Sequence, residues 1–182
     1  MNDERRESVG WELKRLPDIV RPGLDVIFVG INPGKRSAQI GHHFGGANNH
    51  FWRLLYESGW TPRLFAPEED ARLLEHGIGL TNLAPRATRG VSDLTKDEMA
   101  AGGEALKDKL RSWRPKIACF LGKDPYAYYA KVAGARIQWG RQPTSQIPGI
   151  VEFVAPNPSG RSTIPYEVRL RAFKDVRAAL GP

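Results

Sequence analysis

Two short loops carry the residues of this chain that are best suited to chemistry on a bound ligand. Residues 30–34 (GINPG) and 156–160 (PNPSG) each hold an asparagine among Gly and Pro, directly after an apolar run typical of a buried strand. Gly and Pro fix an unusual backbone there, so each loop offers one neutral amide at a strand end. Ligands of open α/β sheets bind beyond the carboxyl ends of the strands. We therefore predict that the two loops form two walls of one pocket.

Two further side chains are candidates for the same pocket. Phe44 is flanked by glycine on its C-terminal side, and its ring could stack on a planar ligand or simply anchor the loop. Asp93 is the nearest carboxylate to the irregular basic segment 84–95. It could order a water or support a developing cation, or it could stabilise the N-terminus of the helix that follows. Asn32 and Asn157, taken singly, are ordinary turn residues, and only their shared placement favours function.

Other types of site are disfavoured by spacing and composition. Residues 30–37 (GINPGKRS) have three residues between their glycines, whereas a phosphate-binding loop has four followed by Gly-Lys-Ser/Thr. The four histidines show no zinc-binding spacing. Cys119 is the only cysteine, so it forms no internal disulfide and holds no iron–sulfur cluster, and we expect a buried structural thiol. We expect no metal and no other cofactor.

Composition indicates a globular protein with a basic surface. At 182 residues we expect a polar N-terminal arm over 1–22 and a single domain over 23–182, acting as a monomer. The net charge of +7 favours a polyanionic partner, although a solvated cationic surface is the alternative. No apolar run is long enough to span a bilayer, and the charged N-terminus lacks a secretory core, so we expect a cytoplasmic protein without membrane contact.

Strand and helix patterns alternate along the chain. Apolar runs predict strands over 24–29, 79–82, 116–121 and 150–155, and helical periodicity predicts helices between and after them, at 49–58, 67–76, 95–113, from 124 onward and 165–180. Residues 35–46 and 84–93 are expected to be irregular. This alternation predicts an α/β protein: a three-layer α/β/α sandwich with a mostly parallel central sheet.

Two predicted helices carry finer signals. Thr95 followed by Glu98 predicts a capping box, and the adjacent Gly102 and Gly103 predict close packing against that helix. In the last helix, spacing predicts one apolar face and one basic face. Val168, Ala172, Phe173, Val176 and Leu180 are expected to face inward, and Arg169, Arg171, Lys174 and Arg177 to face outward.

Taken together, these motifs resemble the mismatch-specific uracil-DNA glycosylase and thymine-DNA glycosylase family. The resemblance runs from about residue 22 to 180. It rests on the two asparagine loops and on intervening landmarks in the same order: Asn48 with Phe51-Trp52, residues 79–82, 101–103, 121–123 and 138–140. The resemblance implies an α/β/α fold and hydrolysis of the bond that joins uracil to deoxyribose in double-stranded DNA.

The resemblance also implies roles for individual residues. Asn32 would position the attacking water, Phe44 would stack on the extruded base, and Asn157 would border the base and its sugar. Ile31 and Asn82 would complete the base pocket. The segment Ser159, Gly160, Arg161, Ser162 and Thr163 would lie in the minor groove and fill the gap in the duplex. No lysine is placed for a Schiff base, so a monofunctional enzyme is expected.

The chain departs from this family pattern at two positions. In the bacterial members that the chain resembles, the residue after the second-loop glycine is an apolar side chain that inserts into the duplex, and an arginine two residues later contacts guanine. This chain has Arg161 and Thr163 at those two positions. A strict preference for guanine opposite the lesion is therefore not predicted. Arg161 could still stack in the gap through its planar guanidinium. A glycosylase for single strands or other damaged bases, and a non-catalytic nucleotide- or nucleic-acid-binding module, are the alternatives.

Overall fold

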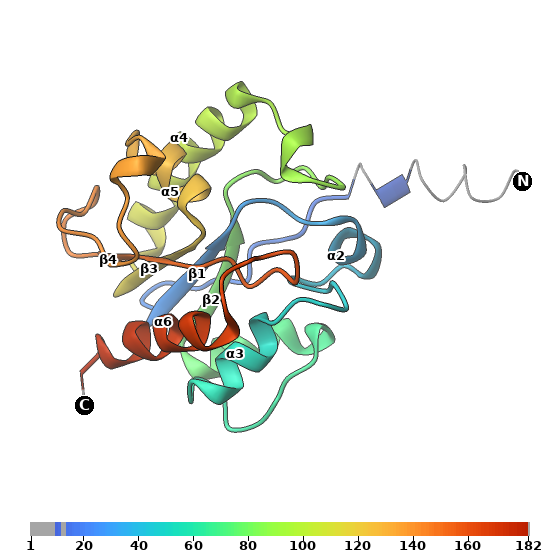
Figure 1. Cartoon of the computed structure of the whole chain (residues 1–182), viewed down its shortest axis with the longest axis horizontal. Helices are drawn as coiled ribbons and strands as arrows, with labels where there is room; N and C mark the ends of the chain where they lie inside the picture. The colour runs from blue at the N-terminus through green and yellow to red at the C-terminus, as the bar shows by residue number, and fades with distance from the viewer. Residues whose placement is uncertain (1–9, 12–13, 182) are drawn as a thin grey trace, which may run out of the picture.

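The structure is a computed structural model that describes residues 10–11 and 14–181. Its centre is a five-stranded sheet in the order β2-β1-β3-β5-β4 (Figure 1). Four strands run parallel, and the short β4 pairs antiparallel with β5 at one edge. Their bounds are β1 Val26–Gly30, β2 Ile78–Asn82, β3 Ile117–Leu121, β4 Gly140–Arg141 and β5 Val151–Ala155. The predicted α/β fold with a mostly parallel sheet is confirmed.

Helices cover both faces of the sheet. α3 (Phe51–Glu57) and α6 (Tyr166–Ala178) lie on one face, and α4 (Lys96–Trp113) and α5 (Lys123–Ala130) lie on the other (Figure 1). Successive strand side chains point to opposite faces, so Phe28 packs on the α3/α6 layer whereas Ile27 packs on the α4/α5 layer. Because both faces are covered, β1 and β3 are buried along their whole length, as the apolar runs require.

The shorter helices account for most differences from the sequence-based prediction. Residues 35–46 are not wholly irregular: α2 (Lys35–Ile40) forms a short helix that ends at Gly41 in the left-handed conformation. The predicted helix over 67–76 is a 3-10 helix, η1 (Pro67–His76). Two more one-turn 3-10 helices are η2 (Val91–Asp93) and η3 (Gly134–Arg136). Periodicity over so few residues does not separate these helix types.

Part of the predicted N-terminal arm lies against the sheet. Ile19 forms an isolated antiparallel bridge with Leu80 of β2, and the Thr81 hydroxyl donates to Asp18. Residues 1–9 and 12–13 of that arm lie outside the described residues. No helix in the described ranges has the length and apolar character needed to cross a membrane.

The faces predicted for the last helix are each wrong at one position. Arg169 is 5% exposed, whereas Val168, which was expected to face the core, is 49% exposed. Phe173 and Val176 are buried as expected. The helix is therefore rotated so that one arginine points into the protein.

The adjacent glycines of α4 allow two very close backbone contacts. A Cβ at Gly102 would lie 2.3 Å from the Leu83 carbonyl oxygen, and one at Gly103 would lie 2.6 Å from the Tyr128 carbonyl oxygen. Any side chain would therefore push α4 away from the segment after β2 or from α5. The predicted close packing is confirmed, and so is the capping box of Thr95 and Glu98 at the start of the same helix.

We predict that Gly102→Ala destabilises the protein, because the new methyl group meets backbone that cannot move alone. The expected loss is about 1–3 kcal/mol in the free energy of unfolding, measured by urea denaturation. Gly134→Ala is the matched control, because nothing lies within 4 Å of a Cβ at that position. Equal stability of the two variants would contradict the close contact.

Candidate active site

A cleft of about 690 Å³ lies beyond the carboxyl ends of the parallel strands. The chain passes from β1 to β2 on one side and then returns to β3 on the other side of β1, so the strand order reverses beside β1. Ligand sites of open α/β sheets lie at such a reversal. Asn32, after β1, and Asn157, after β5, both line this cleft. The prediction that the two loops share one pocket is confirmed.

Most of the residues predicted for the site line this cleft. They are Ile31, Asn32, Phe44, Asn82, Asn157, Ser159, Arg161, Ser162 and Thr163. Two predicted residues are not part of its lining: Gly160 packs against the neighbouring Asn48, and Asp93 lies on the turn next to the cleft. The structure establishes the positions of these residues.

The Asn32 carboxamide is held in one orientation by the segment after β2. Its Nδ2 donates to the Thr88 hydroxyl oxygen at 2.7 Å and to the Arg86 carbonyl oxygen at 2.9 Å. The Thr88 hydroxyl donates to the Gly90 carbonyl, so it can only accept from Asn32. The amide nitrogen therefore points at residues 86–88. Among the described residues Asn32 Oδ1 has no hydrogen-bond partner, so it is free to accept from a ligand or water.

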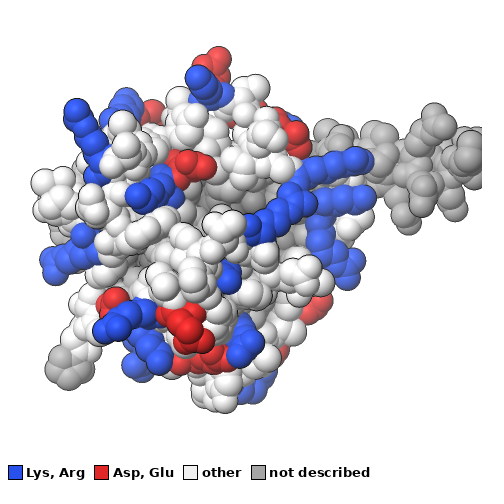
Figure 2. Space-filling model, viewed as in Figure 1, with Lys and Arg blue, Asp and Glu red and all other residues white. Residues whose placement is uncertain are grey.

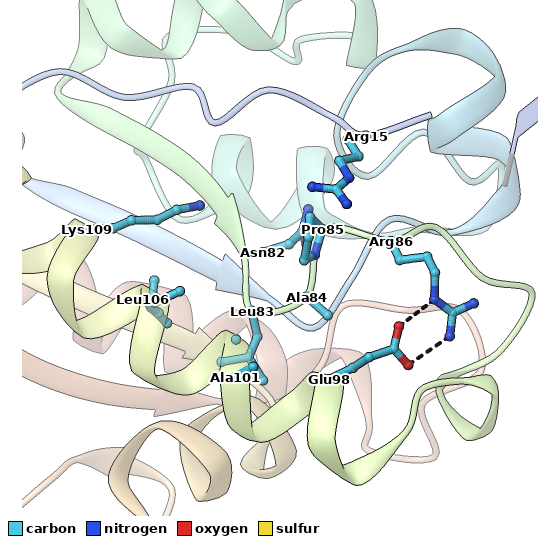
Figure 3. Close-up of a pocket in the computed structure, with 12 residues that line it drawn as sticks. Arg15, Asn82, Leu83, Ala84, Pro85, Arg86, Glu98, Ala101, Leu106 and Lys109 are labelled. Atoms are coloured by element: carbon cyan, nitrogen blue, oxygen red, sulfur yellow. Dashed lines mark hydrogen bonds and ion pairs between the residues drawn. The ribbon is translucent and has the colours of Figure 1, made fainter. Parts of the chain in front are cut away.

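Thr88 and Arg86 are the site residues that sequence reasoning missed. Thr88 is buried, and its backbone amide also donates to the Pro33 carbonyl, which ties the segment to the first loop. The side chain of Arg86 forms a two-pronged ion pair with Glu98 of α4 (Figure 3). That bond lowers the pKa of Glu98 to about 2, so the pair stays charged at neutral pH. No local sequence signal distinguishes this threonine or arginine from ordinary loop residues.

A second hollow, of about 620 Å³, lies beside the cleft between α4 and the segment after β2 (Figure 3). Its floor is apolar, with Leu83, Ala101 and Leu106, and Asn82 borders both hollows. Within the cleft, Asn82 has a close neighbour in β1. A Cβ at Gly30 would lie 2.6 Å from Asn82 Oδ1 and 3.6 Å from the Phe44 ring. Glycine at position 30 therefore makes room for Asn82, while the Phe44 ring lies at ordinary contact distance.

Phe44 is preorganised to offer one face of its ring to the cleft. It has a backbone φ of 51°, in the left-handed region that non-glycine residues rarely adopt. The Gly45 amide donates to the buried Ser37 hydroxyl, which ties this loop to α2. The ring stacks on Phe51 of α3 with centroids 3.9 Å apart. The ring therefore anchors the loop on the core, which is one of the two predicted roles, and it also lines the cleft; stacking on a ligand stays a prediction.

The second loop is stabilised by hydrogen bonds within its own turn and by contacts with residues 48–50. Asn157 Oδ1 accepts from the Ser159 amide, and the Ser159 hydroxyl accepts from the Arg161 amide. The His50 amide donates to the Pro158 carbonyl, and a Cβ at Gly160 would lie 2.4 Å from the Asn48 carbonyl oxygen. Burial lowers the pKa of His50, and the positive charges of Arg169 and Arg53 lower it further. His50 is therefore neutral at physiological pH.

Asp93 is exposed and is engaged within its own turn. Its Oδ2 accepts from the Gly90 amide, and its carbonyl oxygen accepts from Arg86. Gly90 and Val91 line the cleft, so the turn that carries Asp93 forms part of the rim even though the carboxylate does not. The helix that follows is capped by Thr95 rather than by Asp93.

The rim of the cleft is basic. Lys35, Arg36, Arg89 and Arg161 all line it, whereas no aspartate or glutamate within the described part of the chain does. Lys and Arg side chains gather on the side of the molecule that carries α2 (Figure 2). No cluster of His, Cys, Asp and Glu within the described ranges could hold a metal ion. His42 and His43 instead bind Asp70 and the Pro17 carbonyl.

Comparison with known proteins places this arrangement in a family. The model of the uracil DNA glycosylase superfamily matches residues 17–181. The fold is similar to the solution NMR structure of a candidate uracil DNA glycosylase from Methanosarcina acetivorans, with a TM-score of 0.63 and 19% identity. That match covers 93% of this chain and 98% of the other. The chain therefore belongs to the uracil DNA glycosylase superfamily.

Proposed function

We propose that this protein is a monofunctional uracil-DNA glycosylase, related to the mismatch-specific type, that removes uracil from double-stranded DNA without a strict requirement for a mismatch and leaves an abasic site. The observation that carries the proposal is the shared cleft, in which two asparagine loops and an aromatic ring meet under a basic rim. A base extruded from a duplex needs a planar stacking partner, polar groups for its edge and cations for the flanking phosphates. Superfamily membership supports the reaction class.

In the proposed reaction the flipped uracil stacks on Phe44, and Asn157 and Asn82 border its edge and its sugar. The bond between C1′ and N1 breaks with its electron pair leaving on the base, through an oxocarbenium-like sugar. The oxygen of a water molecule then bonds to C1′, and a water proton is released. Asn32 is neutral and is no strong base, so its contribution is to hold this water through its free Oδ1.

The segment of residues 159–163 is proposed to enter the minor groove and occupy the space that the uracil leaves. Arg161 is exposed at the rim and carries a planar guanidinium that can stack between base pairs. Thr163 lacks the long cationic side chain that would select guanine on the opposite strand. The proposed enzyme therefore does not require guanine on the opposite strand and also accepts uracil opposite adenine. Because base flipping is easier at weak pairs, release should be faster from the U·G mismatch than from the U·A pair.

The first prediction is uracil release itself. A duplex with one uracil opposite guanine or adenine should yield alkali-labile sites when incubated with the protein, without strand breaks before alkali. The panel should include single-stranded uracil DNA and duplexes with thymine or alkylated bases. DNA binding without any base release would instead favour a non-catalytic module. Release from single strands alone would contradict the duplex specificity.

Asn32→Ala tests the water-positioning role. We expect the variant to keep its affinity for uracil DNA while single-turnover release falls roughly 10²-fold or more, because the water loses its anchor. Release should be measured with enzyme in excess, and binding by fluorescence anisotropy in low salt. A release rate equal to that of the wild type would remove Asn32 from the mechanism.

Asp93→Ala separates the two interpretations of this carboxylate. If Asp93 supports the developing cation or the water, release should slow by roughly 10²-fold with little change in melting temperature. If it only caps the turn at Gly90, stability should fall by about 0.5–2 kcal/mol while turnover is kept. Asp97→Ala is the matched control, because it removes another exposed acid, from the first turn of α4.

A further inference from the structure

The one arginine that α6 buries lies directly behind the second loop. Arg169 Nη1 lies 3.2 Å from the Ser159 carbonyl oxygen and 3.5 Å from the Pro158 carbonyl oxygen. Its guanidinium carbon lies 5.8 Å from the Tyr166 ring centroid. The side chain has no ion pair among the described residues, and its buried Nε has no hydrogen-bond partner.

Burying the Arg169 guanidinium without a carboxylate partner costs free energy, so its contacts with the loop need an explanation. A buried cation normally needs a carboxylate close by, because desolvation of the charge is expensive. Here the partners are two carbonyl dipoles at the tip of one exposed loop. Bonds from a charged donor to such carbonyls are about twice as strong as neutral ones. The same two carbonyls accept from the amides of His50 and Ser162, so Arg169 completes the bonding of the loop backbone.

We infer that Arg169 is a positioning residue that fixes the loop of residues 157–163 from inside the protein. It does not touch the DNA, because only 5% of its surface is exposed. It thereby determines the position and orientation of the Asn157 side-chain amide and of Arg161 relative to the first loop. The inference rests on the proposed function for what the loop does, but the contact itself concerns the free protein.

Hydrogen exchange at two amides tests the contact without using the enzymatic activity. The His50 amide donates to the Pro158 carbonyl and the Ser162 amide donates to the Ser159 carbonyl, which are the two acceptors of Arg169. In Arg169→Met, both amides should exchange about tenfold faster by NMR. The Gly45 amide, bound to Ser37 across the cleft, should be unchanged.

Arg171→Met is the matched control, because it removes the same charge from an exposed position of the same helix. It should leave all three amides unchanged. Arg169→Lys keeps a cation with fewer donors, so the exchange rates of the His50 and Ser162 amides should lie between those of the wild type and of Arg169→Met. If the methionine variant does not fold, the lysine variant serves as the test. Unchanged exchange at His50 and Ser162, or equal acceleration at all three amides, would overturn the inference.

Uracil release provides the second measurement. Arg169→Met should raise KM about tenfold while kcat changes less, because the loop orders the DNA but Asn32 stays in place. Arg169→Lys should recover part of the loss. A tenfold fall in kcat with an unchanged KM would contradict the positioning role. If the wild type releases no uracil but the exchange results hold, the proposed function is wrong and the loop contact stands.

Discussion

The whole site depends on a single constraint, the position of β3 between β1 and β5. Strands β1, β3 and β5 run parallel, so the segments that follow them leave the sheet at the same edge. The segment after β3 must then turn aside without filling the space between its neighbours. Gly122 makes this turn with a φ of 114°, a backbone conformation that residues with a side chain rarely adopt. The two asparagine loops face one cleft because they follow β1 and β5, the two parallel neighbours of β3, and leave the sheet at the same edge.

The fold was largely predictable because its signals are local and redundant. Each buried parallel strand is a short apolar run, and each long helix has a periodic apolar face, so the α/β alternation follows from the sequence alone. The capping box at Thr95 and the glycine pair of α4 were also predictable, because each has a specific physical requirement. The short elements were less predictable. A six-residue helix such as α2 has too few turns to show periodicity.

The cleft was predictable in outline but not in its supporting contacts. Strand-end asparagines and a glycine-flanked aromatic can be recognised from residue type and position. Thr88 lies 56 residues from the asparagine that it holds, and nothing in its neighbourhood indicates that partner. Arg169 was placed on the wrong face because helical periodicity treats arginine as a surface residue. Such a local violation of pattern is expected where a residue serves a site rather than the core.

These contacts also explain how two loops without regular secondary structure can hold a reacting geometry. Catalysis by positioning requires side chains to be fixed before the substrate arrives, since an error of about 1 Å can cost roughly 10²-fold in rate. The first loop is fixed from the side by Thr88 and Arg86, and the Arg86 side chain is held by Glu98 of α4. The second is fixed from below by Arg169 of α6. Each loop is thus tied to a different helical layer, so the rigidity of the sandwich is transferred to the cleft from both faces of the sheet.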